Sequence, residues 1–293
     1  MKPGIIPLRP LAVGEILDGA FTAMRRYPKA TFGLSAMVSI LSALAQFALV
    51  MSLRDVFAAA TLDPENIDFG DLSGAAAVGL LTIVITGLAG LLFSGMLTVV
   101  ISEAVLGRKI ELGNVWARVK PRMWALIGVS LLVGLVTVIG ALACLLPGIY
   151  LHIALSFTTS ALILEGQSVT GAMGRSRELI KGDWWRVFGI LLLAGIIGSV
   201  VAQVIQTPFG LVGGGSFGSG FGTSGANPFD MTTSSIAIQS LGQMVASTVA
   251  GPITAGVTAL LYIDRRMRRE GLDVALAQAA SAPSAAPTAG SSW

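Results

Sequence analysis

The chain has 293 residues, of which 54% are hydrophobic and only 12% are charged, and its mean hydropathy is +0.79. Soluble domains carry about 25% charged residues, so this composition excludes an ordinary soluble protein and indicates a polytopic membrane protein. The single cysteine, Cys144, excludes an intrachain disulfide. The formal net charge is +3, and the positions of the charges along the chain say more about membrane orientation than this total does.

The apolar runs predict an all-α protein with six transmembrane helices in three hairpins, because roughly 20 apolar residues cross a bilayer. The predicted spans cover residues 30–53, 74–102, 123–146, 148–164, 185–206 and 236–263. Residues 1–29 form an N-terminal segment with an amphipathic helix over 15–26. Residues 264–293 form a basic end, with an Ala/Ser/Pro tail from about residue 275 that we expect to be disordered.

The predicted connections differ in character. Residues 54–71 form an acidic loop, Pro147-Gly148 forms a tight turn, and residues 207–233 form a Gly/Ser-rich loop. Residues 220–225 match the GxGxxG pattern, but this pattern indicates dinucleotide binding only between a strand and a helix, so the match is accidental. Arg25-Arg26 before the first span also fits a twin-arginine export signal, although no soluble domain follows that needs export.

The segment 165–190 joins the fourth and fifth spans as an amphipathic elbow. Val169, Ala172, Met173, Leu179 and Ile180 recur at helical spacing, and charged residues take the opposite face. Amphipathic stretches also precede the first span (15–26) and the third (112–119). The chain therefore shows a weak threefold repeat of an amphipathic interfacial helix, a span out and a span back.

The positive charges predict the orientation. Six spans place both termini on one side, and 18 of the 19 Lys and Arg residues fall on that side, whereas Arg54 lies on the other beside five acids. By the positive-inside rule, both termini are cytoplasmic. We expect a multi-pass protein of a bacterial cytoplasmic (plasma) membrane.

His152, the single histidine, lies near the outer end of the fourth span and is expected to make a hydrogen bond between helices. A metal site needs three or four convergent ligands, so we expect no metal and no cofactor. Ser–His–acid catalysis would have to use His152, and no recognisable nucleophile motif accompanies it. We therefore expect no enzyme activity.

Two groups of polar residues have alternative interpretations. The first group either holds helices together or lines an outer polar cavity for a lipid headgroup or small solute. Its members are Gln46, His152, Gln203, Gln206, Gln239 and Gln243. The second group, Glu103, Glu165 and Asp264 at the inner membrane boundary, either pairs with nearby basic residues or forms a proton or cation relay.

Small residues at four-residue spacing indicate close helix packing, and Pro252 indicates one kink. The pairs are Ser130/Gly134, Gly195/Ser199 and Ser247/Gly251.

The elbow resembles the membrane domain that precedes the catalytic domain in some bacterial glycerophosphodiester phosphodiesterases. The matching residues are Glu165-Gly166, Ser168, Ala172, Arg175-Ser176, Leu179, Gly182 and Trp185. The opening residues 7–10 and 14–21 resemble stand-alone members of that group in high-G+C Gram-positive bacteria. The resemblance implies a six-helix membrane protein, and one histidine cannot supply the paired histidines of the hydrolytic domain.

The favoured hypothesis is a non-catalytic scaffold or accessory module whose basic cytoplasmic face binds anionic lipid or a membrane protein partner. The candidate residues are Arg175, Arg177, Lys181, Arg186, Arg265 and Arg266. The alternative is a small transporter or lipid-handling protein that uses the outer polar cavity, and an intramembrane enzyme is a third, weaker hypothesis. We expect membrane lipids and no nucleic acid as partners, and the oligomeric state stays open.

Overall fold

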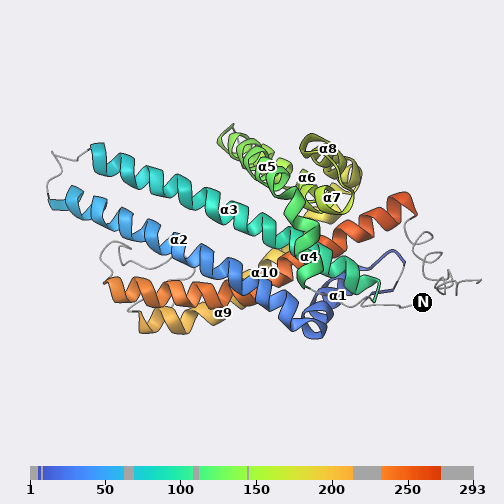
Figure 1. The fold of residues 1–293 in the computed structure, drawn as a ribbon, viewed down its shortest axis with the longest axis horizontal. Helices are drawn as coiled ribbons and strands as arrows, with labels where there is room; N and C mark the ends of the chain where they lie inside the picture. The colour runs from blue at the N-terminus through green and yellow to red at the C-terminus, as the bar shows by residue number, and fades with distance from the viewer. Residues whose placement is uncertain are drawn as a thin grey trace, which may run out of the picture.

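The computed structural model describes residues 6–7, 9–62, 69–107, 112–143, 145–213 and 232–271, and every regular element in these ranges is helical (Figure 1). The elements are α1 (Val13–Arg26), α2 (Pro28–Leu62), α3 (Phe69–Val105), α4 (Leu112–Val119), η1 (Lys120–Arg122), α5 (Met123–Ala143), α6 (Leu145–Ala154), α7 (Thr158–Leu164), α8 (Val169–Ile180), α9 (Trp184–Val212) and α10 (Thr233–Glu270).

Six helical segments within the described residues are long and apolar enough to cross a membrane, which confirms the predicted all-α, six-span class. Four helices are longer than predicted, since α2, α3, α9 and α10 have 35, 37, 29 and 38 residues. Because α2 continues past Arg54 to Leu62 and α3 begins at Phe69, most of the predicted acidic loop 54–71 is helical. At about 1.5 Å per residue these helices exceed a hydrocarbon layer of about 30 Å.

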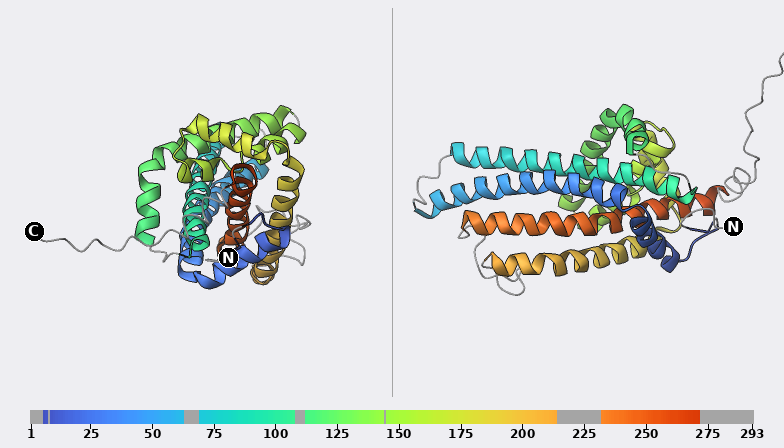
Figure 2. Two further views of the ribbon diagram at one scale, coloured as in Figure 1. Left: turned by 90° about the vertical axis from the view of Figure 1, so that its right-hand side faces the viewer. Right: turned by 60° about the horizontal axis from the view of Figure 1, so that its bottom comes forward.

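The four long helices α2, α3, α9 and α10 run lengthwise, and α5 to α8 cover one side of them (Figures 1 and 2). Close packing of α10 on α2 uses the predicted small residues. Ser247 Oγ donates to Ser39 Oγ at 3.0 Å, and Ser35 Oγ donates to the Ser247 carbonyl at 3.3 Å. A Cβ on Gly251 would lie only 3.1 Å from Ser35 Oγ, so glycine allows this approach.

The two ends of the bundle differ in charge. We call the end that carries α1, α4, α8 and the last turns of α10 the basic end, on the right in Figure 1. The other, far end holds the tips of α2 and α3 and the start of α10. Arg54 lies at the far end, where its Nη1 donates to Thr233 Oγ1 at 3.0 Å.

The three short helices at the basic end bury their apolar faces against the protein. α1 packs Ile16 and Ala20 on α10, and α4 packs Val115 and Val119 on α3. α8 buries the predicted face that includes Ala172 and Leu179, mainly against α7. The amphipathic patterns therefore predicted these helices and the face that α8 buries, whereas Trp116 on α4 is 43% exposed.

α8 is bracketed by two glycines, Gly166 (φ +75°) and Gly182 (φ +93°). Side chains other than glycine rarely adopt this left-handed backbone conformation, so both positions favour glycine where the chain turns into and out of α8. At the first turn of α8, the Ser168 Oγ accepts a hydrogen bond from the Gly171 amide at 3.2 Å. These local features fix the elbow between the fourth and fifth spans.

One prediction about the fourth span is wrong. Pro147 and Gly148 lie in the first turn of α6, where proline is tolerated, so no tight turn forms there. The predicted span itself is confirmed as Leu146–Leu164, and it is built from two helices, because α6 ends at Ala154 and α7 begins at Thr158. The predicted glycine-rich motif 220–225, Cys144 and the C-terminal tail lie outside the described residues.

Candidate functional site

The fourth span is interrupted at Leu155–Phe157, and a serine from α8 supports the interruption. Ser176, which is fully buried, donates from its Oγ to the Ala154 carbonyl at 2.8 Å. The same Oγ accepts a hydrogen bond from the Phe157 amide at 3.1 Å. One hydroxyl therefore satisfies the last carbonyl of α6 and an amide at the start of α7.

The residues around the break explain why the helix is interrupted. Residues 156–160 are Ser-Phe-Thr-Thr-Ser, and hydroxyl side chains compete with the helix for backbone hydrogen bonds. The Thr158 Oγ1, for example, donates to the Leu155 carbonyl at 2.7 Å. Non-helical backbone at membrane depth is tolerated where it is buried in protein or lines a cavity, and here it does both.

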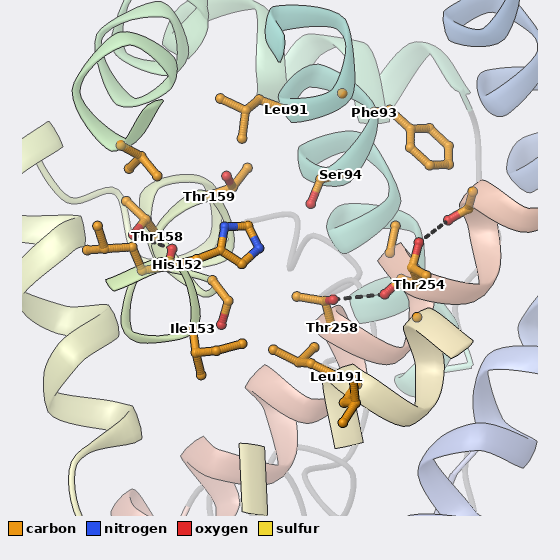
Figure 3. A pocket seen from close by; sticks show the side chains of 18 of the residues that line it. Leu91, Phe93, Ser94, His152, Ile153, Thr158, Thr159, Leu191, Thr254 and Thr258 are labelled. Carbon is orange, nitrogen blue, oxygen red and sulfur yellow. Dashed lines mark hydrogen bonds between the residues drawn. The ribbon is translucent and has the colours of Figure 1, made fainter. Parts of the chain in front are cut away.

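A cavity of about 680 Å³ lies beside this break (Figure 3). Its walls come from α3, α5, α6, α7, α9 and α10 and from the break itself. Half of the described lining residues are aliphatic or aromatic, including Phe93, Val133, Leu191 and Ile196. The volume is within the roughly 300–1,000 Å³ range of ligand-binding pockets, and the lining suits an apolar molecule.

The cavity lies deep in the bundle. On α10 its lining extends from Gly251 to Thr258, which lie thirteen and six residues before Asp264. At about 1.5 Å per residue these positions are about 20 and 9 Å along the helix from the charged residue. That places the cavity near the middle of a hydrocarbon layer about 30 Å thick that begins at Asp264.

The cavity lies partly open beside α9. α9 packs along α10 but contacts α6 little. Two α9 residues that line the cavity, Leu192 and Ile196, are 49% and 50% exposed. Their apolar side chains suit a lateral opening toward lipid between α9 and the α5–α6 hairpin.

The structure separates the six residues of the predicted outer polar group. His152 lines the cavity, whereas none of the five glutamines does. Gln46 lies on α2, and the other four lie on the neighbouring helices α9 and α10 toward the far end. No group of three or more His, Cys, Asp or Glu residues in the described ranges is arranged to hold a metal ion.

The three predicted rim acids each pair with an arginine at the basic end. Glu103 pairs with Arg118 at 2.7 Å. Asp264, which has no exposed surface, pairs with Arg186 at 2.7 Å and accepts a hydrogen bond from the Leu11 amide at 2.8 Å. The pairing interpretation therefore fits all three acids.

Glu165 joins three elements at the basic end. It accepts hydrogen bonds from Arg175 Nε at 2.9 Å and from the Tyr262 hydroxyl at 2.6 Å. Arg175 also pairs with Glu270, and Arg266 Nε lies 2.9 Å from Glu270 Oε2. This network ties the end of the fourth span to α8 and α10.

Four of the six predicted lipid-binding cations take part in such internal pairs: Arg175, Arg186, Arg265 and Arg266. Arg265 is only 1% exposed, so it is not part of a surface that a headgroup contacts. Its guanidinium donates to the Leu179 carbonyl and pairs with Asp183, which holds the pKa of the Asp183 carboxyl below its usual value. Arg177 and Lys181 are exposed.

Residues 76–264 match a family described as a domain of unknown function, DUF7847. The chain belongs to the DUF7847 family. No curated protein and no solved structure matches the chain. The family match carries no link to the membrane domain of glycerophosphodiester phosphodiesterases, so that resemblance stays a prediction.

Sequence reasoning named Ser176 only within the family resemblance and missed both its structural role and the break that it supports. Ser176 lies on the apolar face of α8, three residues after Met173 and three before Leu179. A polar residue in that position signals a buried hydrogen bond, because an unpaired hydroxyl there would be costly. The run of hydroxyl residues at 156–160 was the corresponding signal for the break.

Proposed function

We propose that this protein is a non-catalytic, lipid-handling membrane protein that takes an apolar ligand into the cavity at the break in the fourth span. The observation that carries the proposal is the cavity of about 680 Å³ within the spanning bundle, bordered by interrupted backbone. Interrupted helices at membrane depth commonly surround the binding sites of transporters. The apolar walls and the exposed side chains of Leu192 and Ile196 favour a ligand that arrives from the membrane.

A scaffold role at the basic end is the second candidate. Arg177 and Lys181 support it, since both are exposed on α8 beside the elbow and could attract anionic headgroups. The internal pairing of Arg175, Arg186 and Arg266 reduces the charge available for this role. Double substitution of Arg177 and Lys181 by Gln would weaken binding to anionic vesicles under this hypothesis.

The proposal includes a location. We place the protein in a bacterial cytoplasmic membrane with both termini in the cytoplasm, because the positive-inside rule assigns the basic end to that side. Labelling of single cysteines introduced at Arg177 and at Arg54 in intact cells, with a membrane-impermeant reagent, tests the orientation. Cysteine at position 54 should react and cysteine at position 177 should not.

Two glycines on α9 allow a matched test of the cavity. A Cβ at Gly195 or at Gly189 would meet no atom within 4 Å, so either position accepts a larger side chain. Gly195 lines the cavity and Gly189 does not. Gly195→Phe should therefore fill the cavity, whereas Gly189→Phe adds the same side chain elsewhere on the same helix.

The experiment is native mass spectrometry of the protein released gently from its own membrane. The wild-type protein and Gly189→Phe should retain a bound lipid-like molecule, and Gly195→Phe should lose it. Retention of the same molecule by all three proteins, or by none, would contradict the proposed function.

A further inference from the structure

The polar groups that line the cavity differ in whether they have hydrogen-bond partners. Thr254 and Thr258 donate to carbonyls of their own helix, at 3.1 and 2.8 Å. These hydroxyl protons are therefore already used. Ser94, Ser156 and Thr159 line the cavity without a side-chain hydrogen-bond partner among the described residues.

Among the described residues that line the cavity, His152 is the only ionisable one. Its side chain projects into the cavity, with Thr159 and Ser94 beside it and Leu191 toward the opposite side (Figure 3). His152 is exposed, and Ser94 and Thr159 carry hydroxyls that are not among the fully buried atoms, whereas Ser156 Oγ has almost no accessible surface. Polar groups at membrane depth without partners are costly, which points to a ligand that supplies the missing hydrogen bonds.

We propose that the ligand is a long-chain fatty acid whose carboxyl group binds at His152, Ser94 and Thr159. This inference rests on the proposed function and names its ligand class. An ionised carboxylate offers about four acceptor sites, and the described residues at this end of the cavity offer an N–H of His152 and the hydroxyls of Ser94 and Thr159. The carboxylate can therefore accept a hydrogen bond from each of the three side chains.

The charge balance favours the same ligand. A fatty acid arrives as the neutral acid, and its proton is then shared with or transferred to the His152 imidazole. The pair of carboxylate and imidazolium has no net charge, so the site stays neutral in a low-dielectric environment. A quaternary ammonium headgroup would bring a positive charge that no described lining residue could balance, at a large desolvation cost. A phosphodiester headgroup is ionised at neutral pH, so it would bring a negative charge without a proton to transfer to His152.

The shape of the cavity accommodates the hydrocarbon chain. The polar groups from α3, α6 and α7 lie together, while the α9 wall carries Leu191, Leu192 and Ile196. These apolar side chains border the partly open side, along which a chain can extend toward the lipid. The ligand therefore has a polar end fixed at His152 and an apolar end that reaches the membrane.

The test compares three ligands that share the same hydrocarbon chain and differ in the polar group: hexadecanoic acid, its methyl ester and hexadecanol. Each is tritiated and bound to the full-length protein in nanodiscs, with empty nanodiscs as the blank. We expect the acid to bind at least tenfold more tightly than the ester or the alcohol. His152→Gln should remove this preference, and Gly195→Phe should block all three ligands while Gly189→Phe blocks none.

The outcomes separate this inference from the function on which it rests. Equal binding of all three ligands, all blocked by Gly195→Phe, would overturn the fatty acid and leave the lipid-binding cavity intact. Binding that Gly195→Phe does not block would overturn both. A carboxyl carbon-13 resonance that shifts on binding to the wild-type protein but not to His152→Gln would support the assignment of the carboxyl group to His152.

Discussion

The support that Ser176 gives to the fourth span leads to a prediction about Ser176→Ala. This change removes one oxygen atom and leaves no large void, so its effect measures the lost hydrogen bonds. The Ala154 carbonyl and the Phe157 amide, now 2.8 and 3.1 Å from Ser176 Oγ, would both lose that partner in the protein interior. A buried polar group without a partner costs about 1–3 kcal/mol.

We therefore expect Ser176→Ala to lower the free energy of unfolding by about 2–4 kcal/mol, allowing for partial relaxation of the break. For a chain of this size, about 2–4 °C of Tm corresponds to 1 kcal/mol, so the expected fall in Tm is roughly 5–15 °C. The measurement is thermal unfolding in one detergent, followed by intrinsic tryptophan fluorescence. Hydrogen exchange at residues 155–158 should become faster at the same time.

Ser199→Ala provides the matched control. Its Oγ donates to the Ile196 carbonyl of its own helix at 2.9 Å, and the residue is exposed. The loss of that bond should change stability by less than about 0.5 kcal/mol. If Ser176→Ala unfolds at the same temperature as Ser199→Ala, with unchanged exchange at the break, Ser176 does not stabilise the interrupted span.

The charged groups at the basic end give two further predictions. Asp264→Asn should lower the free energy of unfolding by about 3–5 kcal/mol, because it leaves Arg186 and Arg268 beside a neutral group. Because Asp264 also accepts a hydrogen bond from the Leu11 amide, the segment around Leu11 should become more sensitive to protease. The hydrogen bond from Arg265 lowers the pKa of the Asp183 carboxyl. Its contribution to stability is therefore fully present above the ordinary aspartate pKa of about 4, and it is lost as the pH falls through the lowered pKa. Asp183→Asn should therefore flatten the acid side of the dependence of Tm on pH.

Much of the fold could be predicted because it depends on properties that are local in the sequence. Apolar length gave six spans, and helical spacing gave the face that α8 buries. Charge placement favoured acid–arginine pairs, since an acid such as Asp264 at the edge of an apolar run needs a cation nearby. The partner itself is not local, because Arg186 lies 78 residues from Asp264.

The site could not be predicted in the same way because it depends on contacts between distant segments. Apolar length does not reveal whether a span is continuous, and the break becomes stable only when Ser176 reaches Ala154 and Phe157. His152 was expected to group with Gln203 and Gln239 because of their similar position along the spans. The structure brings His152 beside Ser94 of α3, which sequence separation does not indicate, and beside Thr159 of α7, which lies about two helical turns further along the chain.

The break and the cavity are best understood as one feature. A continuous fourth span would satisfy its own backbone and would need no hydroxyl from α8. Interrupting it requires a buried serine in α8, whose position is fixed by Arg175, Glu165 and the contacts of the basic end. His152 on α6 and Thr159 on α7 lie seven residues apart, about two helical turns, and they line the same space on either side of the interruption. The paired charges at the basic end thus hold in place the helix on which the geometry of the deep, apolar cavity depends.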